Sequence, residues 1–495
     1  MDEIAQFGTI VLVVAGGFLA AIVSSKLTER IPIPAPALFL LVAAGASDLF
    51  PRVAEALSIK DVERIAVVAL VVILFDGGMN IGWRRFRAAA VPIVSLGVLG
   101  TFATAGVMAV AARYLFGFDW ITAGILGAAL APTDPAVMFS VLGNREVGGR
   151  SGTILEGESG FNDPVGIALM IGMVELATTE GASFWTVVRE FAVEMSVGLA
   201  IGVVGAALLV PFMRRVPLPS EAHYPLRALA SAGVVYGLAS LAHGSGFLAV
   251  FVAGILIGDA RAPYKGEIER FHKSLASVAE IVVFVALGVT IHLGSLGADK
   301  LWLDALLLAL ILIFVARPLT TGPLLLLARL RAGERLLIVW GGLKGAVPIL
   351  LAAFALSGEV EGAGRVYGIV FVVVAFSVIF QGVSLPFAAA RLGVHMRIVE
   401  PEPWDISIRL RREPRGVQRY VVAADARAAG KTIADLPIGG ETWISLVLRE
   451  GEATQARGST VLEPGDEVLV LGEAADARAI RDLFERPEGD GSQQR

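Results

Sequence analysis

Two acids, an amide and a hydroxyl lie close together in one apolar stretch of the sequence, between Glu158 and Pro164. If this stretch is helical, the i, i+4 spacing stacks Glu158 under Asn162 and Ser159 under Asp163, so two polar rows run along one side of the helix. Carboxylate, amide and hydroxyl oxygens suit a hard monovalent cation such as Na⁺ or K⁺. The run therefore predicts a cation-binding site on a helix.

Pro164 and Asp163 widen the range of ligands that this run could bind. A proline has no N–H to donate to the carbonyl of Gly160, so one further oxygen is left free. A partly desolvated carboxylate can hold a proton in place of a cation, which would let Asp163 alternate between two cargoes. The alternative is that these residues only join helices by hydrogen bonds. Membrane helices are usually joined through Ser, Thr or Asn rather than through two acids.

The preceding apolar stretch carries two prolines, in the run Ala131-Pro132-Thr133-Asp134-Pro135. Each proline removes a backbone donor and disfavours helical conformation in the residue before it, so we expect the helix to break there. Unwound backbone inside a membrane is tolerated only where it lines a cavity or is buried in protein. A proline kink without functional meaning is the alternative, and the polar Thr133 and Asp134 argue against it.

A second interrupted apolar stretch, Trp340 to Pro348, contains several glycines and one cation, Lys344. This stretch lies in the twelfth predicted helix, and the break at Thr133-Asp134 lies in the fifth. Helices separated by an odd number of spans cross the membrane in opposite directions, as an inverted repeat requires. Two crossing broken helices expose positive and negative half-helix ends. The negative charge of Asp134 would offset the positive ends, and the positive charge of Lys344 would offset the negative ends. The alternative is that Lys344 snorkels to the membrane boundary.

Arg317 is a further cation within an apolar stretch. Because a guanidinium is always charged, a buried Arg317 must find an acid. Glu158 is the natural partner, and their pairing would leave Asp163 as the group that titrates. Asp76, in the apolar run Leu74 to Gly78, is as consistent with an interfacial anchor as with a residue of the ion pathway.

These residues lie in a chain of 495 residues with an apolar share of 55% and a mean hydropathy of +0.72, which are typical of membrane proteins. The chain turns polar after about Arg397. The net charge of −5 and the 5 histidines exclude a basic nucleic-acid surface and an imidazole-rich metal site. The chain has no cysteine, so redox usage does not indicate its compartment. The composition predicts a polytopic membrane protein with a soluble C-terminal part.

Apolar stretches of membrane-spanning length predict about 13 helices. They begin near residues 7, 34, 62, 91, 120, 151, 185, 225, 246, 275, 301, 335 and 366. The first follows Asp2 and Glu3 and precedes Lys26, the reverse of a secretory signal, so we expect a retained span with the N-terminus outside. In this orientation the predicted inner loops hold 17 basic residues and the outer loops 7. The positive-inside rule then puts the C-terminal part in the cytoplasm.

The expected fold is all-α in the membrane, with inverted repeats and two broken crossing helices, followed by a small cytosolic α+β domain. We place a membrane domain at 1–395, a linker at 396–415, the α+β domain at 416–486 and a disordered tail at 487–495. The predicted strands are Arg419–Ala423, Trp443–Leu448 and Glu467–Leu471, and the turn signals are Gly439-Gly440 and Pro464-Gly465-Asp466.

Four of these motifs together resemble the cation:proton antiporters of the NhaP and sodium/proton-exchanger type. They are Thr-Asp-Pro at 133–135, Glu-Ser-x-x-Asn-Asp at 158–163, Arg-Pro at 317–318 and Gly-Gly-Leu-Lys-Gly-Ala at 341–346. The resemblance covers about Ile10 to Val394. It implies the same helix count, a homodimer, and an elevator-like movement of a core domain that gives alternating access at Asp163.

The same resemblance implies a role for each polar residue of the first two motifs. Thr133, Ser159 and Asp163 would contact the transported monovalent cation. Asn162 would support the site, and Asp134 would belong to the same cation and proton site.

The resemblance also makes Glu158 and Arg317 a structural ion pair and assigns Lys344 to compensation of the helix break. Relatives of this type have Asn-Asp where the electrogenic branch has Asp-Asp, so Asn162 before Asp163 implies electroneutral one-for-one exchange. Lys344 departs from many relatives, which carry arginine there. Lysine keeps the positive charge but lacks the forked guanidinium geometry of arginine.

The soluble part, from about Val417 to Phe484, resembles the C-terminal lobe of the TrkA, or RCK, regulators of potassium transport. The likeness rests on Gly430–Leu436, Ile444–Arg449 and Leu462–Gly472. It implies cytosolic regulation, extra dimer contact and a nucleotide-type regulatory ligand, although this part shows no Gly-x-Gly-x-x-Gly fingerprint. Membrane antiporters with this lobe tend to be bacterial K⁺/H⁺ exchangers, so we expect the bacterial inner membrane and K⁺ rather than Na⁺.

Rival functions fit the sequence less well. A gated cation channel would show short carbonyl-lined loops repeated around a pore, and a symporter for an organic solute would show more polar lining. An enzyme would show a nucleophile paired with a base in the spans. Na⁺/H⁺ exchange on the same fold is the alternative to K⁺/H⁺ exchange. The expected partners are the cation, the proton, membrane lipid and a second copy of the chain, with no cofactor and no nucleic acid.

Overall fold

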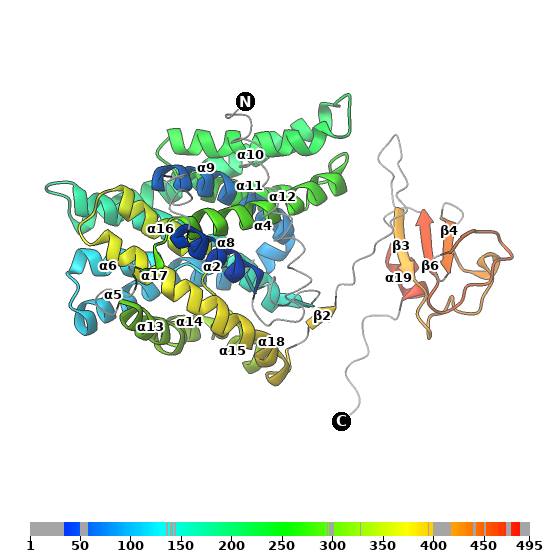
Figure 1. Cartoon of the computed structure of the whole chain (residues 1–495). Coiled ribbons are helices and arrows are strands. Elements are labelled where there is room, and N and C mark those ends of the chain that lie inside the picture. Colours follow the sequence, from blue (N-terminus) through cyan, green and yellow to red (C-terminus); the bar gives the residue numbers. More distant parts are fainter. Residues whose placement is uncertain are drawn as a thin grey trace, which may run out of the picture. The chain divides into compact units, whose positions relative to one another are not determined.

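A computed structural model of the chain (Figure 1) describes residues 34–49, 58–134, 137–138, 142, 145–294, 296, 301–326, 328–394, 396–398, 417–438, 442–449, 452–471 and 477–485. The chain divides into two units, Met1–Pro401 and Glu402–Arg495. The first unit is mostly helical, and the second contains a small sheet.

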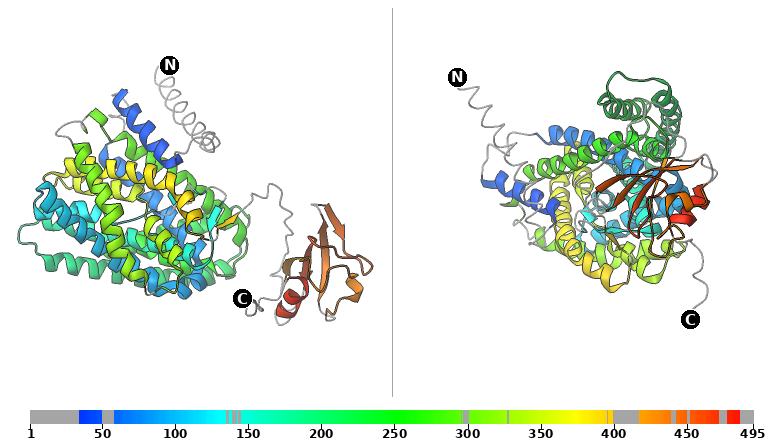
Figure 2. Two further views of the ribbon diagram at one scale, coloured as in Figure 1. Left: turned by 90° about the horizontal axis from the view of Figure 1, so that it is seen from below. Right: turned by 90° about the vertical axis from the view of Figure 1, so that its right-hand side faces the viewer.

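The helices of the first unit pack side by side (Figures 1 and 2). They are α2 (Ala35–Leu49), α4 (Ile59–Val94), α5 (Thr101–Phe116), α6 (Trp120–Leu130), α8 (Gly149–Thr178), α9 (Phe184–Arg215), α10 (His223–Leu241), α11 (Gly246–Gly258), α12 (Lys265–Val289), α13 (Leu301–Ile311), α14 (Arg317–Leu325), α15 (Ala332–Trp340), α16 (Ala346–Ser357), α17 (Ala363–Phe376) and α18 (Gly382–Arg391). Single π-helical turns join α4 to α5, α13 to α14 and α17 to α18, at Ser95–Gly100, Leu312–Ala316 and Ser377–Gln381.

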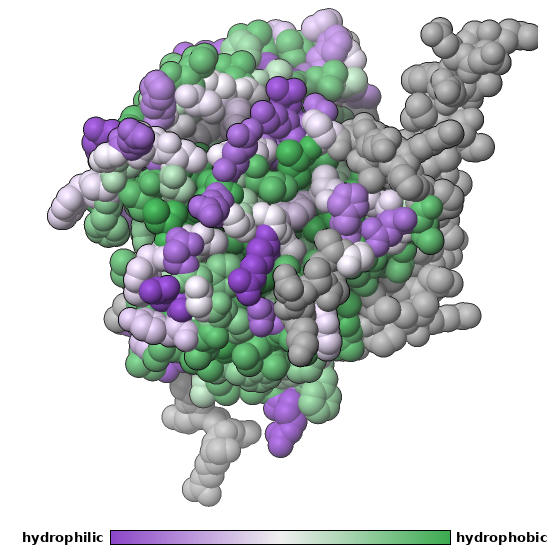
Figure 3. All heavy atoms as spheres, turned by 60° about the vertical axis from the view of Figure 1, so that its left-hand side comes forward, coloured by the Kyte–Doolittle hydropathy of each residue, from purple (hydrophilic) through white to green (hydrophobic). Residues whose placement is uncertain are grey.

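Many large apolar side chains lie on the outer surface of this unit. Within the described residues, six helical stretches are long and apolar enough to cross a membrane: Ile59–Phe116, Gly149–Thr178, Phe184–Arg215, Lys265–Val289, Leu301–Leu325 and Ala363–Arg391. In α9, Trp185 is 74% exposed and Leu208 68% exposed, and hydrophobic residues cover much of the face in Figure 3. Lipid tolerates such a surface and water does not, so the first unit is a multi-pass membrane domain. The first predicted span, Phe7 to Val23, lies outside the described residues.

The third and fourth predicted spans form one run that bends at Gly82. Gly82 has a φ of 65°, in the left-handed region that favours glycine. The Asp259 carboxylate lies against Gly82 and accepts a hydrogen bond at 2.6 Å from the Arg84 N–H, which caps the second half of α4. This half begins well before the start predicted near Val91, because a cap supplied by a residue so distant in sequence is not visible in the local pattern.

α12 also begins earlier than predicted, at Lys265 rather than near Leu275. Its charged first turns were expected in a loop. Two salt bridges with i, i+3 and i, i+4 spacing stabilise these turns as helix: Arg270–Glu267 at 2.8 Å and Lys265–Glu269 at 3.3 Å. As a result, Glu280 lies well inside the helix rather than near its start.

α8, which carries the run from Glu158 to Pro164, is a continuous helix of 30 residues that packs against α4, α6, α9, α11 and α16. Its glycines allow this dense packing. A Cβ would overlap the Ile93 side chain at Gly157, the Phe251 ring at Gly160 and the Pro132 ring at Gly166. The polar side chains of α8 are therefore surrounded by protein.

Two helices end at non-helical segments. α6 ends at Leu130, and residues 131–134 are not helical. α15 ends at Trp340, and α16 begins only at Ala346. The two segments meet, because the Asp134 N–H donates to the Leu343 carbonyl at 2.8 Å. Pro135, the second proline of the predicted break, lies outside the described residues.

A short ribbon joins the segment before α8 to the end of the membrane unit. Strand β1 (Arg145–Val147) pairs antiparallel with β2 (Met396–Ile398), with Glu146 opposite Arg397. The sequence pattern indicated only a linker from Met396 onward. The start of that predicted linker is thus a strand, paired a few residues before the first turn of α8.

The second unit is an antiparallel sheet with one helix, α19 (Ala477–Phe484). Its strands are β3 (Val417–Val421), β4 (Trp443–Arg449), β5 (Glu452–Gln455) and β6 (Glu467–Leu471), in the order β3-β6-β4-β5. A buried core that includes Tyr420, Val447, Val468 and Phe484 holds the sheet and helix together. The small α+β domain is confirmed. β3 begins two residues before the predicted start, β5 was not predicted, and Gly439-Gly440 lies outside the described residues.

An ion pair in this unit gives a pH-dependent contribution to stability. Burial would raise the pKa of Asp466, but hydrogen bonds from Arg449 and from the Glu463 N–H outweigh it and lower the pKa. The contribution is therefore present above the ordinary carboxyl range and is lost as pH falls through the folded pKa. We expect Asp466→Asn to destabilise this unit by about 1–3 kcal/mol at neutral pH, and acid to abolish the difference. Amide hydrogen exchange of β4 and β6 in the full chain measures this, and equal protection of both proteins at neutral pH would contradict it.

Candidate functional site

Glu158 and Arg317 lie together in the interior of the membrane unit. Arg317 Nη1 donates to Glu158 Oε1 at 2.5 Å. Arg317 is 5% exposed and Glu158 is 1% exposed. Arg317 is at the first position of α14, and its Nη2 also donates to the carbonyl of Ile338 in α15 at 3.5 Å. The ion pair therefore ties α8 to two helices of the second half of the chain.

Thr133, Ser159 and Asn162 form one hydrogen-bonded cluster. Asn162 Nδ2 donates to Thr133 Oγ1 at 2.8 Å, and Thr133 Oγ1 lies 3.1 Å from Ser159 Oγ. All three residues are buried. Thr133 belongs to the non-helical segment after α6, so the cluster fixes that segment on the middle of α8.

Asp163 follows Asn162 on α8 and is a lining residue of a cavity. It is 6% exposed, and its Oδ1 atom has no hydrogen-bond partner among the described residues. Thr133, Ser159 and Asn162 do not line that cavity. The cluster residues are thus held by hydrogen bonds to one another, whereas Asp163 keeps one buried oxygen without a partner in the described part of the chain.

Lys344 and Asp134 each meet the backbone of the opposite non-helical segment. Lys344 is 1% exposed, and its Nζ donates to the carbonyls of Ala131 at 2.9 Å and Pro132 at 2.8 Å. These carbonyls lie at the C-terminal end of α6, where a cation offsets the helix dipole. The Asp134 carboxylate lies against Gly345, the residue before α16, where an acid offsets the opposite end.

Two glycines of the second motif have a steric role that the sequence reading missed. A Cβ on Gly342 would overlap the Arg317 guanidinium, and a Cβ on Gly345 would overlap the Asp134 carboxylate. The glycines therefore leave room for the two charged groups. Their number within one apolar stretch was the available signal, but the sequence does not show which side chains approach them.

We expect Gly345→Ala to impair transport by displacing the Asp134 carboxylate, with a stability loss of about 1–3 kcal/mol from overpacking. Cation-dependent proton flux and thermal melting of the same preparation measure the two effects. Gly364→Ala in α17 is the matched control, because a Cβ there meets nothing within 4 Å. Flux of Gly345→Ala equal to that of the control would contradict the steric role.

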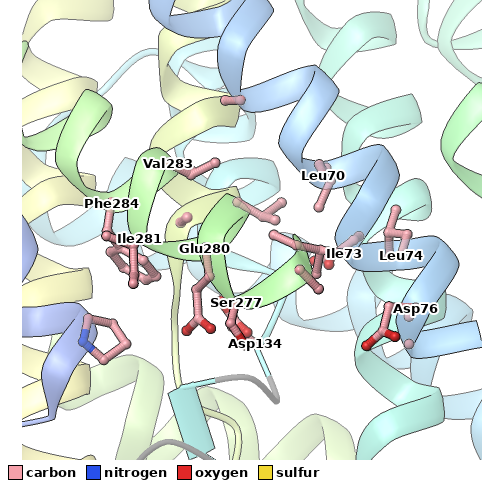
Figure 4. Close-up of a pocket in the computed structure, with 18 of the residues that line it drawn as sticks. Leu70, Ile73, Leu74, Asp76, Asp134, Ser277, Glu280, Ile281, Val283 and Phe284 are labelled. Carbon is pink, nitrogen blue, oxygen red and sulfur yellow. The ribbon is translucent and has the colours of Figure 1, made fainter. Parts of the chain in front are cut away.

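The cavity beside Asp163 has a volume of about 700 Å³ and is lined mostly by apolar side chains (Figure 4). Its acidic lining residues are Asp76, Asp134, Glu156, Asp163 and Glu280, and its basic ones are Arg85 and Lys273. An excess of acids in a cavity with apolar walls attracts cations. Asp76, for which the sequence left two interpretations, lines this cavity and accepts a hydrogen bond from Asn80 at 2.8 Å.

The sequence analysis missed two of the lining acids, Glu156 and Glu280. The signal was present, since Glu280 is the one charged residue between Ser274 and Val289. The predicted span began too late for this acid to be recognised as a mid-helix residue.

The chemistry available to this arrangement is the binding and release of small cations. A buried carboxylate with an unpartnered oxygen can hold a proton or a monovalent cation. The polar groups around it hold the interrupted helices in place. Within the part of the chain that the structure describes, no group of three or more His, Cys, Asp or Glu residues is suited to a multivalent metal ion.

Both units match known families. The family model described as "Sodium/hydrogen exchanger, transmembrane" matches residues 16–391 of the sequence. The family model described as "TrkA-C domain" matches residues 417–485. The K(+)/H(+) antiporter NhaP of Alkalimonas amylolytica is 34% identical over 482 residues, which cover 95% of this chain and 82% of that protein. The Na(+)/H(+) antiporter NhaH of Halobacillus dabanensis is 28% identical over 336 residues, which cover 66% of this chain and 82% of that protein.

A solved structure shares the fold of the membrane unit. The sodium proton antiporter MjNhaP1 from Methanocaldococcus jannaschii, solved at pH 8, superposes with a TM-score of 0.67 at 22% sequence identity. The match covers 79% of this chain and 99% of that one.

Proposed function

The chain belongs to the sodium/hydrogen exchanger family, and we propose that it exchanges protons for K⁺, in preference to Na⁺, at the Asp163 carboxylate. One observation carries the choice of residue. Asp163 is buried, lines the acidic cavity and has an oxygen without a hydrogen-bond partner in the described part of the chain. A proton or a monovalent cation can occupy that position, and competition between them couples the two fluxes.

The neighbouring polar residues support this cycle in separate ways. The Glu158 carboxylate is paired with Arg317, so its role in the cycle is structural. The cluster of Asn162, Thr133 and Ser159 holds the non-helical segment against α8 and supplies oxygens close to Asp163 when the cation loses its water. Asn162 is uncharged, so Asp163 is the one carboxylate of the Asn-Asp pair, which favours electroneutral one-for-one exchange.

Asp134 and Lys344 belong to the same proposal as groups that compensate the two broken helices. Lys344 donates to carbonyls at the end of α6, and Asp134 lies beside the start of α16. We propose that these helices cross within an inverted repeat of about 13 spans. Alternating access to Asp163 then comes from movement of the bundle that contains α8 relative to the rest of the membrane unit.

The proposed setting is the inner membrane of a bacterium, with the N-terminus outside and the TrkA-C-like domain in the cytoplasm. The positive-inside rule supports this orientation. We propose a homodimer, with the exposed apolar faces of α9 and α10 available to lipid or to a second copy. The same proposal includes the division into a membrane domain at 1–395, a linker at 396–415, the α+β domain at 416–486 and a tail at 487–495.

Support for K⁺ comes from relatives and from the C-terminal domain. Relatives that match nearly the whole chain carry the name K(+)/H(+) antiporter, and the TrkA-C match adds a domain related to potassium regulators. Na⁺/H⁺ exchange is the alternative, favoured by the NhaH match over the membrane unit. A regulated cation channel is the remaining alternative.

Proton flux in proteoliposomes distinguishes these functions. An outward K⁺ or Na⁺ gradient is applied while a trapped dye reports the internal pH, with the membrane potential either clamped at zero or left free. Electroneutral exchange predicts the same cation-driven pH change in both conditions, with K⁺ more effective than Na⁺. A pH change that needs the membrane potential would contradict one-for-one exchange, and no change with either cation would overturn the function.

We propose that the C-terminal domain regulates exchange through the β1–β2 ribbon. β2 is the point at which the chain leaves the membrane unit, and β1 directly precedes α8. Two truncations separate the domain from the ribbon. A chain ending at Ile398 keeps β2, and a chain ending at Val394 loses it. We expect the first to keep exchange but lose regulation, and the second to exchange more slowly. Identical behaviour of the two truncations would argue against the ribbon.

The regulatory ligand of this domain is proposed to be of nucleotide type. Adenine nucleotides should then shift the melting temperature and the exchange rate of the full chain and leave the chain ending at Ile398 unchanged.

A further inference from the structure

Glu280, in α12, is a carboxylate that lines the cavity. Figure 4 shows its side chain and that of Asp134 pointing into the same part of the cavity, and the two are close enough for their charges to interact. Its Oε1 atom is buried and has no hydrogen-bond partner among the described residues. An ionisable residue in an apolar membrane helix is costly unless its charge is used or balanced.

The cations near Glu280 are engaged elsewhere or lie apart from it. Lys344 Nζ donates to two backbone carbonyls, and Arg85 Nε donates to the carbonyl of Ile81 at 3.0 Å. Lys273 is exposed, two helical turns before Glu280. Over the described residues, no salt bridge joins Glu280 to a lysine or arginine. A structural ion pair therefore does not explain this acid.

We propose that Glu280 is a second cation-handling carboxylate, which holds the incoming monovalent cation between itself and Asp134 before the cation reaches Asp163. This inference rests on the proposed function. The cavity already contains a nearly fully buried acid, Asp163, with an oxygen that has no hydrogen-bond partner among the described residues, so it can receive a positive charge. A carboxylate on α12 facing one on the α6 side lowers the cost of bringing a partly hydrated cation away from bulk water.

The inference predicts a loss of cation affinity rather than a loss of turnover. Glu280→Gln keeps the shape and removes the charge, so we expect the KM for the cation to rise by about tenfold to a hundredfold, as for loss of one charged contact. The maximal exchange rate should stay close to that of the unaltered chain. Glu280→Asp should recover part of the affinity. Glu267→Gln, on the same helix but outside the cavity, is the matched control and should leave KM unchanged.

The absence of cysteine in this chain gives a second test within one protein. Glu280→Cys should have a raised KM. Modification by an anionic methanethiosulfonate should restore a low KM, whereas a cationic one should not, and saturating K⁺ should slow the modification. A purely structural role for Glu280 predicts no dependence on the sign of the reagent.

The outcomes separate this inference from the proposed function. If Asp163→Asn is inactive while both Glu280→Gln and Glu280→Cys have the KM of the unaltered chain, only the role of Glu280 is overturned. Loss of exchange in Glu280→Gln at every cation concentration, with the fold intact, would also overturn it, because Glu280 would then be the exchanging group. If Asp163→Asn still exchanges, the assignment of exchange to Asp163 in the proposed function is wrong.

Discussion

Asp163→Asn is expected to abolish exchange at every cation concentration while leaving the protein folded. The substitution keeps the shape of the side chain but removes a buried carboxylate that lines the cavity and has an oxygen without a hydrogen-bond partner in the described structure. An amide cannot take up a proton in exchange for a cation, so the coupling between the two fluxes is lost. The cation-driven pH change in proteoliposomes measures the exchange activity of the variant, and its melting temperature shows whether the protein is folded.

Asp304→Asn serves as the matched control for this experiment. Asp304 pairs with Arg365 at 2.9 Å, and both side chains are partly exposed, so their loss should cost little. Exchange near the unaltered rate in Asp163→Asn would move the transport site to another carboxylate of the cavity.

Glu158→Gln is expected to be the most destabilising of the substitutions considered in the membrane unit. It leaves the Arg317 guanidinium buried without its counter-charge, which costs about 3–5 kcal/mol for a pair enclosed in protein. The loss should appear as a lower melting temperature in detergent and as reduced yield, at least as clearly as in the exchange rate. Since Arg317 also contacts α15, the damage should extend to the non-helical segment that follows that helix.

Glu158→Gln combined with Arg317→Met tests the cause of the instability. Removing both charges leaves no unpaired ion, so the double variant should melt at a higher temperature than Glu158→Gln alone. Normal melting of the single variant would show that the pair does not contribute to stability, and a double variant as unstable as the single one would assign the loss to shape rather than charge.

Much of the site could be predicted because buried charge limits the choices. An arginine within an apolar stretch needs an acid, and the run from Glu158 to Asp163 offers two. The sequence therefore predicted that Glu158 and Arg317 form a pair, although 159 positions separate them in the chain. In the same way, two apolar stretches interrupted by proline and glycine, one with Asp134 and one with Lys344, indicated non-helical backbone with compensating charge. Local chemistry alone supports these steps.

The direction in which each polar group points was beyond the sequence pattern. Asn162 and Asp163 are consecutive, so helical geometry turns them to different sides, but it does not say which side holds Thr133 and which holds the cavity. The early start of α12 hid the position of Glu280. The pairing of β1 with β2 depends on two short segments far apart in the chain, and strands of such length carry almost no periodic signal.

The sequence by itself determined the class of the protein, the presence of a small C-terminal domain, and the residues able to bind a cation or a proton, because hydrophobic length and residue type are local properties. The tertiary structure decided the rest. It joined Asn162 to Thr133, placed Asp163 and Glu280 in the lining of one acidic cavity, and set Gly342 and Gly345 where Arg317 and Asp134 need space. These relations depend on how helices distant in the chain pack against one another, and packing is a property of the assembled core rather than of any one segment.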